Sequence, residues 1–192
     1  DEFKKIISKA LPLAKSGKLV TFGISPNKPA TEYGYIKKGE KFEDGYHVKK
    51  FVEKPNKDTA KKYVKSGNYL WNSGIFMFKA SRYSEELKKL EPEIYNHCKD
   101  SLAKSKVDLD FTRIDADSFK KCESISIDYA VMEKTDQSVV VPMSVGWNDL
   151  GSWNSYWEVS NKDSNGNVIF GDAIVANSKN NLILSESKLV ST

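Results

Sequence analysis

The sequence predicts an α/β protein with a mixed, mainly parallel sheet that is flanked by helices. Stretches with the 3.6-residue periodicity of amphipathic helices alternate with short runs rich in apolar and β-branched residues. Clusters of Gly, Pro, Asn and Asp separate these stretches. At 192 residues the chain is long enough to bury a substantial core. Because strands alternate with helices, we expect helical connections between strands.

Composition and charge argue against several classes of partner. The 30 basic and 26 acidic residues give a formal charge of +4, and the lysines are scattered along the chain rather than gathered into a stripe, which disfavours nucleic-acid binding. No stretch approaches the roughly 20 apolar residues of a membrane-spanning helix. The first residues mix acids and lysines, unlike a secretory signal. We therefore expect a cytoplasmic protein without a nucleic-acid or membrane partner.

The two cysteines, Cys98 and Cys122, lack the CxxC spacing of zinc and redox motifs. His47 and His97 are poorly placed to complete a zinc site with them. In a cytoplasmic protein we expect both cysteines to be ordinary reduced thiols.

The first part of the chain predicts a helix, a buried strand, a hairpin and a second helix. The opening amphipathic helix ends near Gly17, and LVTFGI at 19–24 reads as a strand inside the sheet. Residues 33–55 form two extended stretches, for which the Asp-Gly dipeptide at 44–45 is the best turn signal. Residues 56–67 have a capping Asn, one apolar face and a closing Gly, which predicts a short surface helix.

The second part of the chain predicts further strands and helices before its character changes. These elements are an apolar strand at 75–78 entered through a turn at 72–74, two helices from 81 to about 105 with Pro92 starting the second, a helix at 124–134, a strand at 138–143 and a helix that starts at Ser152. Beyond Lys162, short β-rich runs are punctuated by Asn, Gly and Asp. We predict one domain over 1–162 and the start of a β-rich domain over 163–192.

Residues in loops that follow strands are the first candidates for a site, because α/β sheets bind ligands beyond the carboxyl ends of their strands. Gly34 could let a ligand approach the backbone, or it could serve only a bulge or turn. Glu53 could accept hydrogen bonds from sugar hydroxyls and Lys54 could bind a phosphate, or the two could be an exposed pair at a strand end.

Three further polar residues are candidates, each with a structural alternative. Asn72 can donate and accept, as polyol recognition requires, or it can belong to a polar turn. Asp128 could contact a substrate or simply charge the first turn of a helix. Asp149, enclosed by glycines and tryptophans, is the best ligand candidate for Mg²⁺. It could instead cap the next helix, where Ser152 competes for that role.

Four motifs carry a resemblance to a known family. FVEKP at 51–55, YLWNSGIFMF at 69–78, SIDYAVMEKT at 126–135 and VGWNDLGSW at 145–153 resemble the mannose-1-phosphate guanylyltransferases, which are sugar nucleotidyltransferases. LVTFGI followed by EYGYI extends the match upstream, so that the similarity covers essentially the whole chain. The resemblance implies a Rossmann-like fold of the nucleotide-diphospho-sugar transferase type, followed by a β-helix-like linker domain.

The resemblance also implies a reaction and roles for the candidate residues. The reaction is transfer of GMP from GTP to mannose 1-phosphate with Mg²⁺, which yields GDP-mannose and pyrophosphate. Because the sugar phosphate is the nucleophile, no Ser-His-Asp set is expected. By motif correspondence, Gly34, Glu53 and Asn72 would line the mannose pocket, Lys54 would approach the phosphate, and Asp149 would hold Mg²⁺. Asp128, a candidate from its own residue type, is a further substrate-binding candidate.

The sequence departs from the family pattern in two ways. The family usually has Thr-Gly-Tyr-Gly where this chain reads Thr-Glu-Tyr-Gly at 31–34, so Glu32 could crowd that loop. The glycine-rich loop that cradles the triphosphate does not occur in this sequence, and neither does the upstream aspartate that shares the metal. We therefore expect the chain alone to be inactive, with most of the nucleotide bound elsewhere.

Two other expectations follow from these departures. Missing first strands would leave an open sheet edge, which favours self-association or a homo-oligomer. The alternatives to the enzyme are a non-catalytic sugar-phosphate-binding or regulatory subunit, and a nucleotidyltransferase for another hexose 1-phosphate such as glucose 1-phosphate.

Overall fold

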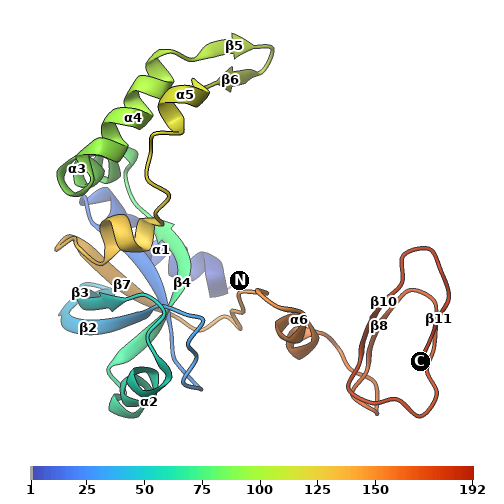
Figure 1. The fold of residues 1–192 in the computed structure, drawn as a ribbon. Helices are drawn as coiled ribbons and strands as arrows, with labels where there is room; N and C mark the ends of the chain where they lie inside the picture. Colours follow the sequence, from blue (N-terminus) through green and yellow to red (C-terminus); the bar gives the residue numbers. More distant parts are fainter. Residues whose placement is uncertain (1) are drawn as a thin grey trace. The chain divides into compact units, whose positions relative to one another are not determined.

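The computed structural model describes residues 2–192, and the chain divides into two compact units, of which the first ends at Val145 and the second is Gly146–Thr192 (Figure 1). A five-stranded sheet closed in the order β1-β4-β2-β3-β7 forms the centre of the first unit. Its strands are β1 (Leu19–Ile24), β2 (Tyr35–Phe42), β3 (Gly45–Val52), β4 (Tyr69–Met77) and β7 (Ser138–Met143).

The helices of the first unit surround this sheet or project from it. They are α1 (Glu2–Lys15), α2 (Lys57–Ser66), α3 (Ala80–Leu90), α4 (Pro92–Ala103) and α5 (Ala116–Phe119), together with the π-helical turn η1 (Asp128–Met132). A hairpin of β5 (Lys106–Asp108) and β6 (Phe111–Arg113) lies between α4 and α5. Figure 1 shows that α3, α4, this hairpin and α5 form an arm between β4 and η1.

The mixed α/β class is confirmed, but the prediction of a mainly parallel sheet is wrong. Among the described strands of this sheet, β1 and β7 pair in parallel and the other four pairings are antiparallel. A parallel pair needs a crossover of about a dozen residues or more. The direct connection between β2 and β3 is a two-residue turn, which can join only antiparallel neighbours.

The sheet closes through a short pairing of β3 with β7, in which Tyr46 lies opposite Val140 and His47 opposite Val139. Closure removes unpaired strand edges, so this pairing covers part of the open edge that the sequence predicted. Self-association of the chain stays a prediction.

The turn of the β2–β3 hairpin lies one residue earlier than predicted. Phe42 pairs with Gly45, so the turn residues are Glu43 and Asp44, and Glu43 adopts a positive φ of 49°. Gly45 is needed for a different reason. A Cβ atom at this position would lie 2.7 Å from the Val140 carbonyl oxygen of β7, so glycine permits the closure of the sheet.

The predicted turn at 72–74 is wrong, because these residues lie inside β4. Thr21 of β1 pairs with Phe76 while Gly23 pairs with Asn72, so the register shifts in a β-bulge. The bulge leaves Asn72 and Ser73 only 8% exposed. A β-bulge changes the direction in which the neighbouring side chains point. The periodicity of the strand sequence does not reveal such a bulge.

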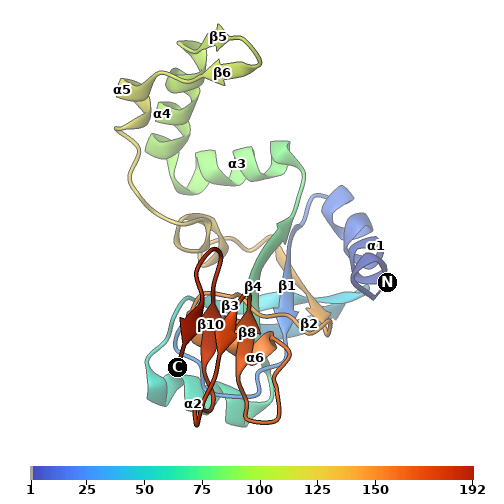
Figure 2. The same cartoon turned by 90° about the vertical axis from the view of Figure 1, so that its right-hand side faces the viewer.

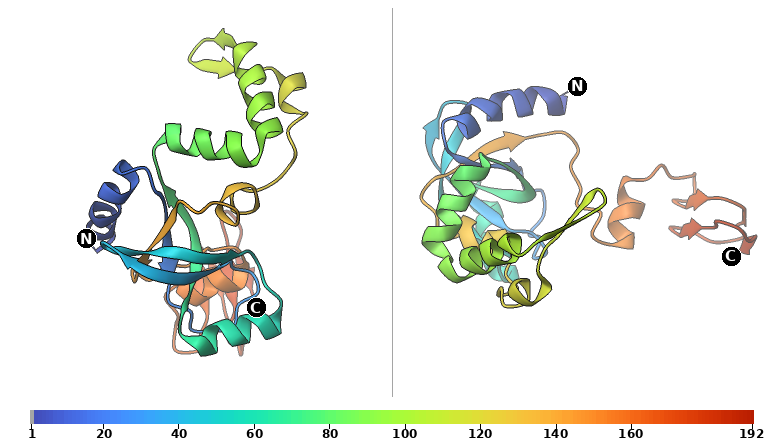
Figure 3. Two further views of the ribbon diagram at one scale, coloured as in Figure 1. Left: turned by 90° about the vertical axis from the view of Figure 1, so that its left-hand side faces the viewer. Right: turned by 90° about the horizontal axis from the view of Figure 1, so that it is seen from above.

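The two predicted helices that flank the sheet are confirmed. The helix α1 buries its apolar face, which includes Ile6, Ala10 and Leu13, and packs along β1 and β7 (Figure 3, blue). The helix α2 is capped by the Asn56 side chain, which accepts a hydrogen bond from the Thr59 amide at 2.9 Å, and ends at Gly67 with a φ of 69°. These caps satisfy backbone groups that a helix leaves unpaired at its ends.

One core cluster of the first unit lies between the sheet and η1. Its buried members are Leu19, Ile36, Phe51, Leu70, Ala130, Val131, Met132 and Val140. Three of these eight residues belong to η1, so burial of their side chains fixes the position of this turn. The helix predicted over 124–134 is realised as this short turn. The pair α3 and α4, with Pro92 starting the second helix, is confirmed.

The second unit consists of a helix and short parallel strands. The helix α6 (Trp153–Val159) starts after Ser152, and β8 (Val168–Phe170), β9 (Ala173–Ile174), β10 (Leu182–Leu184) and β11 (Val190–Ser191) follow. Parallel pairing joins β8 to β10 and β9 to β11 (Figure 2). The Asn167 side-chain oxygen accepts hydrogen bonds from the Asn181 amide groups at 3.0 and 3.2 Å. The predicted boundary at 162–163 falls between α6 and β8 and stays a prediction.

Residues 2–192 contain no helix that combines the length and the apolar character needed to cross a lipid bilayer.

We expect Gly45→Ala to destabilise the first unit by about 1–3 kcal/mol, because the added methyl group overlaps a backbone carbonyl of β7. Urea unfolding followed by circular dichroism measures this change. Lys49→Ala, at an exposed position of the same strand, is the control. An unchanged unfolding midpoint for Gly45→Ala would contradict the close approach of β3 and β7.

Candidate functional site

Asn72 is the centre of a buried polar cluster in the first unit. Its side-chain oxygen accepts hydrogen bonds from the Thr21 hydroxyl at 3.1 Å and from the Gly74 amide at 3.2 Å. Its side-chain nitrogen donates to the Asp128 carboxylate at 3.0 Å. These contacts fix the orientation of the amide, because its oxygen and nitrogen ends meet groups of opposite character.

Gly34 and Glu53 lie against Asn72. The Asn72 backbone amide donates to the Gly34 carbonyl at 2.8 Å. A Cβ atom at Gly34 would lie 2.3 Å from the Glu53 Oε2 atom and 3.2 Å from the Asn72 Cβ atom. An added methyl group would therefore displace the Glu53 carboxylate from its present position. The structure brings together Gly34, Glu53, Asn72 and Asp128 from four different segments.

The Glu53 carboxylate is buried and incompletely satisfied. Its side chain is 9% exposed, and within residues 2–192 no donor reaches the Oε2 atom. Burial raises the pKa of Glu53, and the nearby Asp128 and Glu133 carboxylates raise it further, while Lys54 lowers it. A buried acceptor without a donor costs free energy, so this atom suits a hydroxyl donor from a ligand.

Lys54 follows Glu53 in a left-handed backbone conformation, with a φ of 44°. Its ammonium lies 3.4 Å from the Glu53 Oε1 atom and its side chain is 60% exposed. Positive φ is uncommon for residues with a side chain and costs free energy unless the surrounding structure holds it. Here buried Glu53 precedes Lys54 and buried Pro55 follows it, so the ammonium stays in solvent beside a buried carboxylate.

Two members of the cluster were not predicted from the sequence. Thr21 is fully buried within β1, and a hydroxyl in the otherwise apolar run LVTFGI was its only signal. The Glu133 carboxylate accepts a hydrogen bond from the Glu53 amide at 2.8 Å. A hydrogen bond of 2.9 Å from the Glu133 amide to the Asp128 carbonyl closes η1, and such i→i+5 turns occur often at functional sites.

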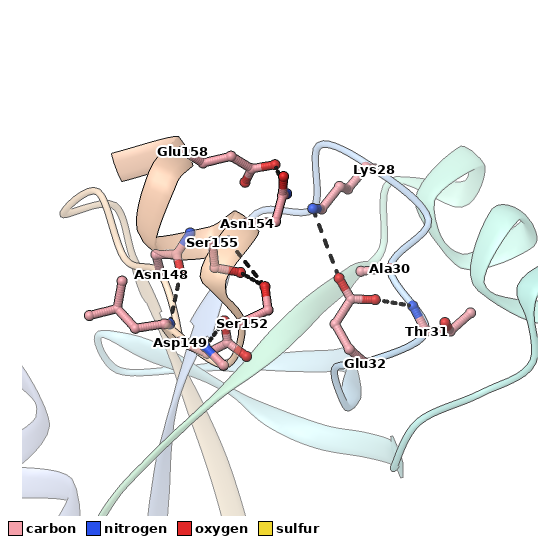
Figure 4. Close-up of polar contacts among 12 residues, drawn as sticks. Lys28, Ala30, Thr31, Glu32, Asn148, Asp149, Ser152, Asn154, Ser155 and Glu158 are labelled. Atoms are coloured by element: carbon pink, nitrogen blue, oxygen red, sulfur yellow. Dashed lines mark hydrogen bonds and ion pairs between the residues drawn. The ribbon is translucent and has the colours of Figure 1, made fainter. Parts of the chain in front are cut away.

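Glu32, the departure from the family pattern, organises its own loop. Its carboxylate accepts a hydrogen bond from the Thr31 amide at 2.9 Å and lies 3.9 Å from the Lys28 ammonium (Figure 4). Both charged side chains are about half exposed, so the ion pair contributes little to stability. The neighbouring Tyr33 packs edge to face on Trp71, with ring centroids 5.0 Å apart.

Asp149 belongs to the second unit, so the cluster of the first unit is built without it. One Asp149 oxygen accepts a hydrogen bond from the Gly151 amide at 3.2 Å. The cap of α6 is Ser152, whose hydroxyl accepts a hydrogen bond from the Ser155 amide at 3.0 Å (Figure 4). The capping alternative for Asp149 is therefore wrong.

Magnesium is the metal that the sequence resemblance implies, and one exposed carboxylate fits its chemistry. The described residues contain no group of three or more His, Cys, Asp or Glu side chains that could hold a metal ion. Mg²⁺ is commonly held by one or two protein carboxylates together with substrate phosphates and water. Asp149 is exposed, and its second oxygen lies close to Gly151, where an added Cβ atom would come within 2.7 Å of it.

The profile of the nucleotidyl transferase family matches residues 1–166. The chain belongs to this family. A mannose-1-phosphate guanylyltransferase from Salmonella muenchen is 53% identical to this chain over 191 residues, which are 99% of this chain and 40% of the relative. The chain spans about two fifths of the length of the curated relatives it matches.

Two solved structures resemble the fold of this chain. The structure of a mannose-1-phosphate geranyltransferase from Thermus thermophilus aligns with 100% of this chain, and the alignment covers 55% of the Thermus protein. The TM-score is 0.84 and the sequence identity is 28%. The structure of a mannose-6-phosphate isomerase from Helicobacter pylori aligns with 77% of this chain, and the alignment covers 58% of the Helicobacter protein. The TM-score is 0.70 and the sequence identity is 36%. The predicted resemblance is confirmed: the chain is a homologue of mannose-1-phosphate guanylyltransferases.

We expect Glu53→Gln to gain stability relative to the wild type as pH rises from about 4 to 7. The folded-state pKa of Glu53 is raised, so the folded protein holds this proton more tightly than the unfolded chain does. The resulting stabilisation is complete below the unfolded pKa and is lost as pH rises through the folded pKa. Glutamine removes this dependence.

Denaturant unfolding at a series of pH values checks this expectation, with Glu40→Gln at an exposed position as the control. A constant difference in unfolding free energy between Glu53→Gln and the wild type across this range would rule out a raised Glu53 pKa.

Proposed function

We propose that this chain is the sugar-phosphate-binding part of a mannose-1-phosphate guanylyltransferase. The whole enzyme transfers GMP from GTP to mannose 1-phosphate and forms GDP-mannose and pyrophosphate. The observation that carries the proposal is the convergence of Gly34, Glu53, Asn72 and Asp128 in one polar cluster with an acceptor that has no donor. Relatives named mannose-1-phosphate guanylyltransferase, at about half identity over nearly the whole chain, support the choice of sugar.

The cluster is suited to a hexose because sugar hydroxyls both donate and accept hydrogen bonds. The Glu53 Oε2 atom accepts from one hydroxyl of the sugar. The Asn72 amide, oriented by Thr21 and Asp128, is placed to contact another. Gly34 keeps the carboxylate and the amide adjacent, since any side chain there would displace Glu53.

Lys54 is the residue we assign to the phosphate of the substrate. Its ammonium is exposed and compact, which suits a phosphate group that arrives from solvent. Since Glu53 and Lys54 are adjacent in the sequence, one segment would bind both a hydroxyl of the sugar and the phosphate group. Attack by a phosphate oxygen on the α-phosphorus of GTP depends on positioning and on charge neutralisation rather than on an activated nucleophile.

Asp149 is the residue that would hold Mg²⁺, which when bound neutralises charge on the phosphates. The loop around Asp149 contributes this exposed carboxylate.

We expect the purified chain to bind mannose 1-phosphate and Lys54→Ala to weaken this binding about tenfold or more, the loss typical of a charge-assisted contact. Isothermal titration calorimetry measures the affinity. Lys54 is exposed, so the variant retains the fold, and Lys57→Ala is a matched exposed control nearby. Asn72→Ala should lose binding as well, and its circular dichroism shows whether it folds.

The same titration separates the alternatives. Tighter binding of glucose 1-phosphate would assign the site to another hexose 1-phosphate. An affinity for both sugars that is unaffected by Lys54→Ala and Asn72→Ala would contradict the assigned site. A protein that contains this chain and binds the sugar phosphate but releases no pyrophosphate with GTP would be a binding subunit.

We expect Asp149→Asn, introduced into the natural protein that carries this chain, to raise the Mg²⁺ concentration for half-maximal pyrophosphate release about tenfold or more, because one anionic ligand becomes neutral. Asp172→Asn, at another exposed position of the second unit, is the control. An unchanged Mg²⁺ dependence would remove Asp149 as the ligand.

A further inference from the structure

Two thiols that the proposed site does not use lie in contact within the arm. Cys98 is on α4 and Cys122 follows α5, and their Sγ atoms are 3.7 Å apart. Both side chains are half-buried and neither is in a disulfide. A disulfide bond is about 2.05 Å long, so the two contacting sulfurs must move closer together for the bond to form.

The backbone on both sides of the thiols is held in place. The helices α4 and α5 pack against each other. The Ser101 hydroxyl donates to the Asp115 carbonyl at 2.7 Å, and the Asp115 amide donates to the Ser101 carbonyl at 3.0 Å. The Lys104 ammonium donates to the Ser118 hydroxyl at 3.2 Å. The approach of the two sulfurs therefore follows from the packing of two helices and not from two side-chain rotamers alone.

We propose that Cys98 and Cys122 are a disulfide-forming site that reacts with small disulfides of the glutathione type. One cysteine, as its thiolate, attacks a sulfur of the small disulfide, forms a mixed disulfide and releases one small thiol. The second cysteine loses its proton and attacks the protein sulfur of the mixed disulfide. The bond between Cys98 and Cys122 forms and the second small thiol leaves.

The exchange balances in electrons and protons. The protein gives up two electrons and two protons, and the small disulfide becomes two small thiols. Both cysteines are free thiols in the structure, and burial and the neighbouring Cys122 raise the pKa of the Cys98 thiol, so Cys98 must lose a proton before it can attack. This agrees with the reduced thiols expected from the sequence and adds a reaction that they undergo when the thiol pool is oxidised.

The disulfide bond would stabilise α5 and the loosely packed β5–β6 hairpin. It closes a loop over a sequence separation of 24, which contains the β5–β6 hairpin and α5. In the hairpin, Val107 is 85% and Leu109 is 89% exposed, so apolar burial contributes little to its stability. Restricting the unfolded arm favours the folded one.

The bond also lies close to the polar cluster along the chain. Between Cys122 and Asp128, Ile125 and Ile127 pack against the core of the first unit. Oxidation would therefore tie α4 to the segment that delivers Asp128 to Asn72. This consequence rests on the proposed function, whereas formation of the bond does not.

The test oxidises the purified 192-residue chain with oxidised glutathione, quenches it with acid and blocks the remaining thiols with N-ethylmaleimide. We expect a monomer whose intact mass falls by about 2 Da, the two hydrogens lost in the exchange. Peptide mapping should find Cys98 linked to Cys122. Amide hydrogen exchange over the β5–β6 hairpin and α5 should slow at least about tenfold in the oxidised form.

The variants Cys98→Ser and Cys122→Ser are matched controls, since each leaves one thiol that can form only a mixed disulfide. Thermal unfolding verifies that they fold. The proposal is overturned if the wild type carries glutathione on both cysteines, forms only intermolecular dimers or keeps two alkylatable thiols. These readouts use no sugar phosphate, so they stand whatever the outcome of the binding titrations.

Discussion

The candidate site depends on the hydrogen bonds of one buried amide. Asn72 sits in the bulge of β4, where its side chain links β1 through Thr21 to η1 through Asp128. A buried amide needs hydrogen-bond partners for both its oxygen and its nitrogen. Its hydrogen bonds therefore fix β1 and η1 in position relative to β4. Glu53 is then brought beside it by Gly34. Removal of this amide would leave the buried Thr21 hydroxyl with only its longer contact to the Ile75 carbonyl, at 3.5 Å, and would remove the hydrogen bond from Asn72 to the Asp128 carboxylate.

The electrostatic interactions within the cluster are unfavourable for an ionised Glu53. Three carboxylates, those of Glu53, Asp128 and Glu133, lie near one another, and one of them is largely buried. Desolvation and like charge both oppose ionisation of Glu53, and the exposed Lys54 compensates only in part. Functional sites commonly keep such unfavourable arrangements because a ligand relieves them. The cluster is thus poised for a partner that brings hydrogen-bond donors.

Much of the fold followed from the sequence where local rules were sufficient. Helical periodicity and capping residues placed α1, α2 and the α3–α4 pair, because these signals act within a few residues. Strand direction was not accessible, since it depends on which distant strands pair. The bulge at Asn72 and the π-helical turn at Asp128 were also missed, because tertiary packing overrides local propensity there. Gly34, Glu53, Asn72 and Asp128 were candidates from their residue types and positions, and the resemblance added roles for the first three, while Thr21 and Glu133 were recognised only from the structure.

At Lys54, the left-handed backbone conformation and the charged side chain favour different residue types. Glycine or asparagine would adopt this φ more readily than lysine, which bears a cost of about 1 kcal/mol there. A protein selected for stability alone would therefore favour glycine or asparagine at residue 54. The proposed phosphate contact would therefore use a cation at a position where glycine would give the more stable fold.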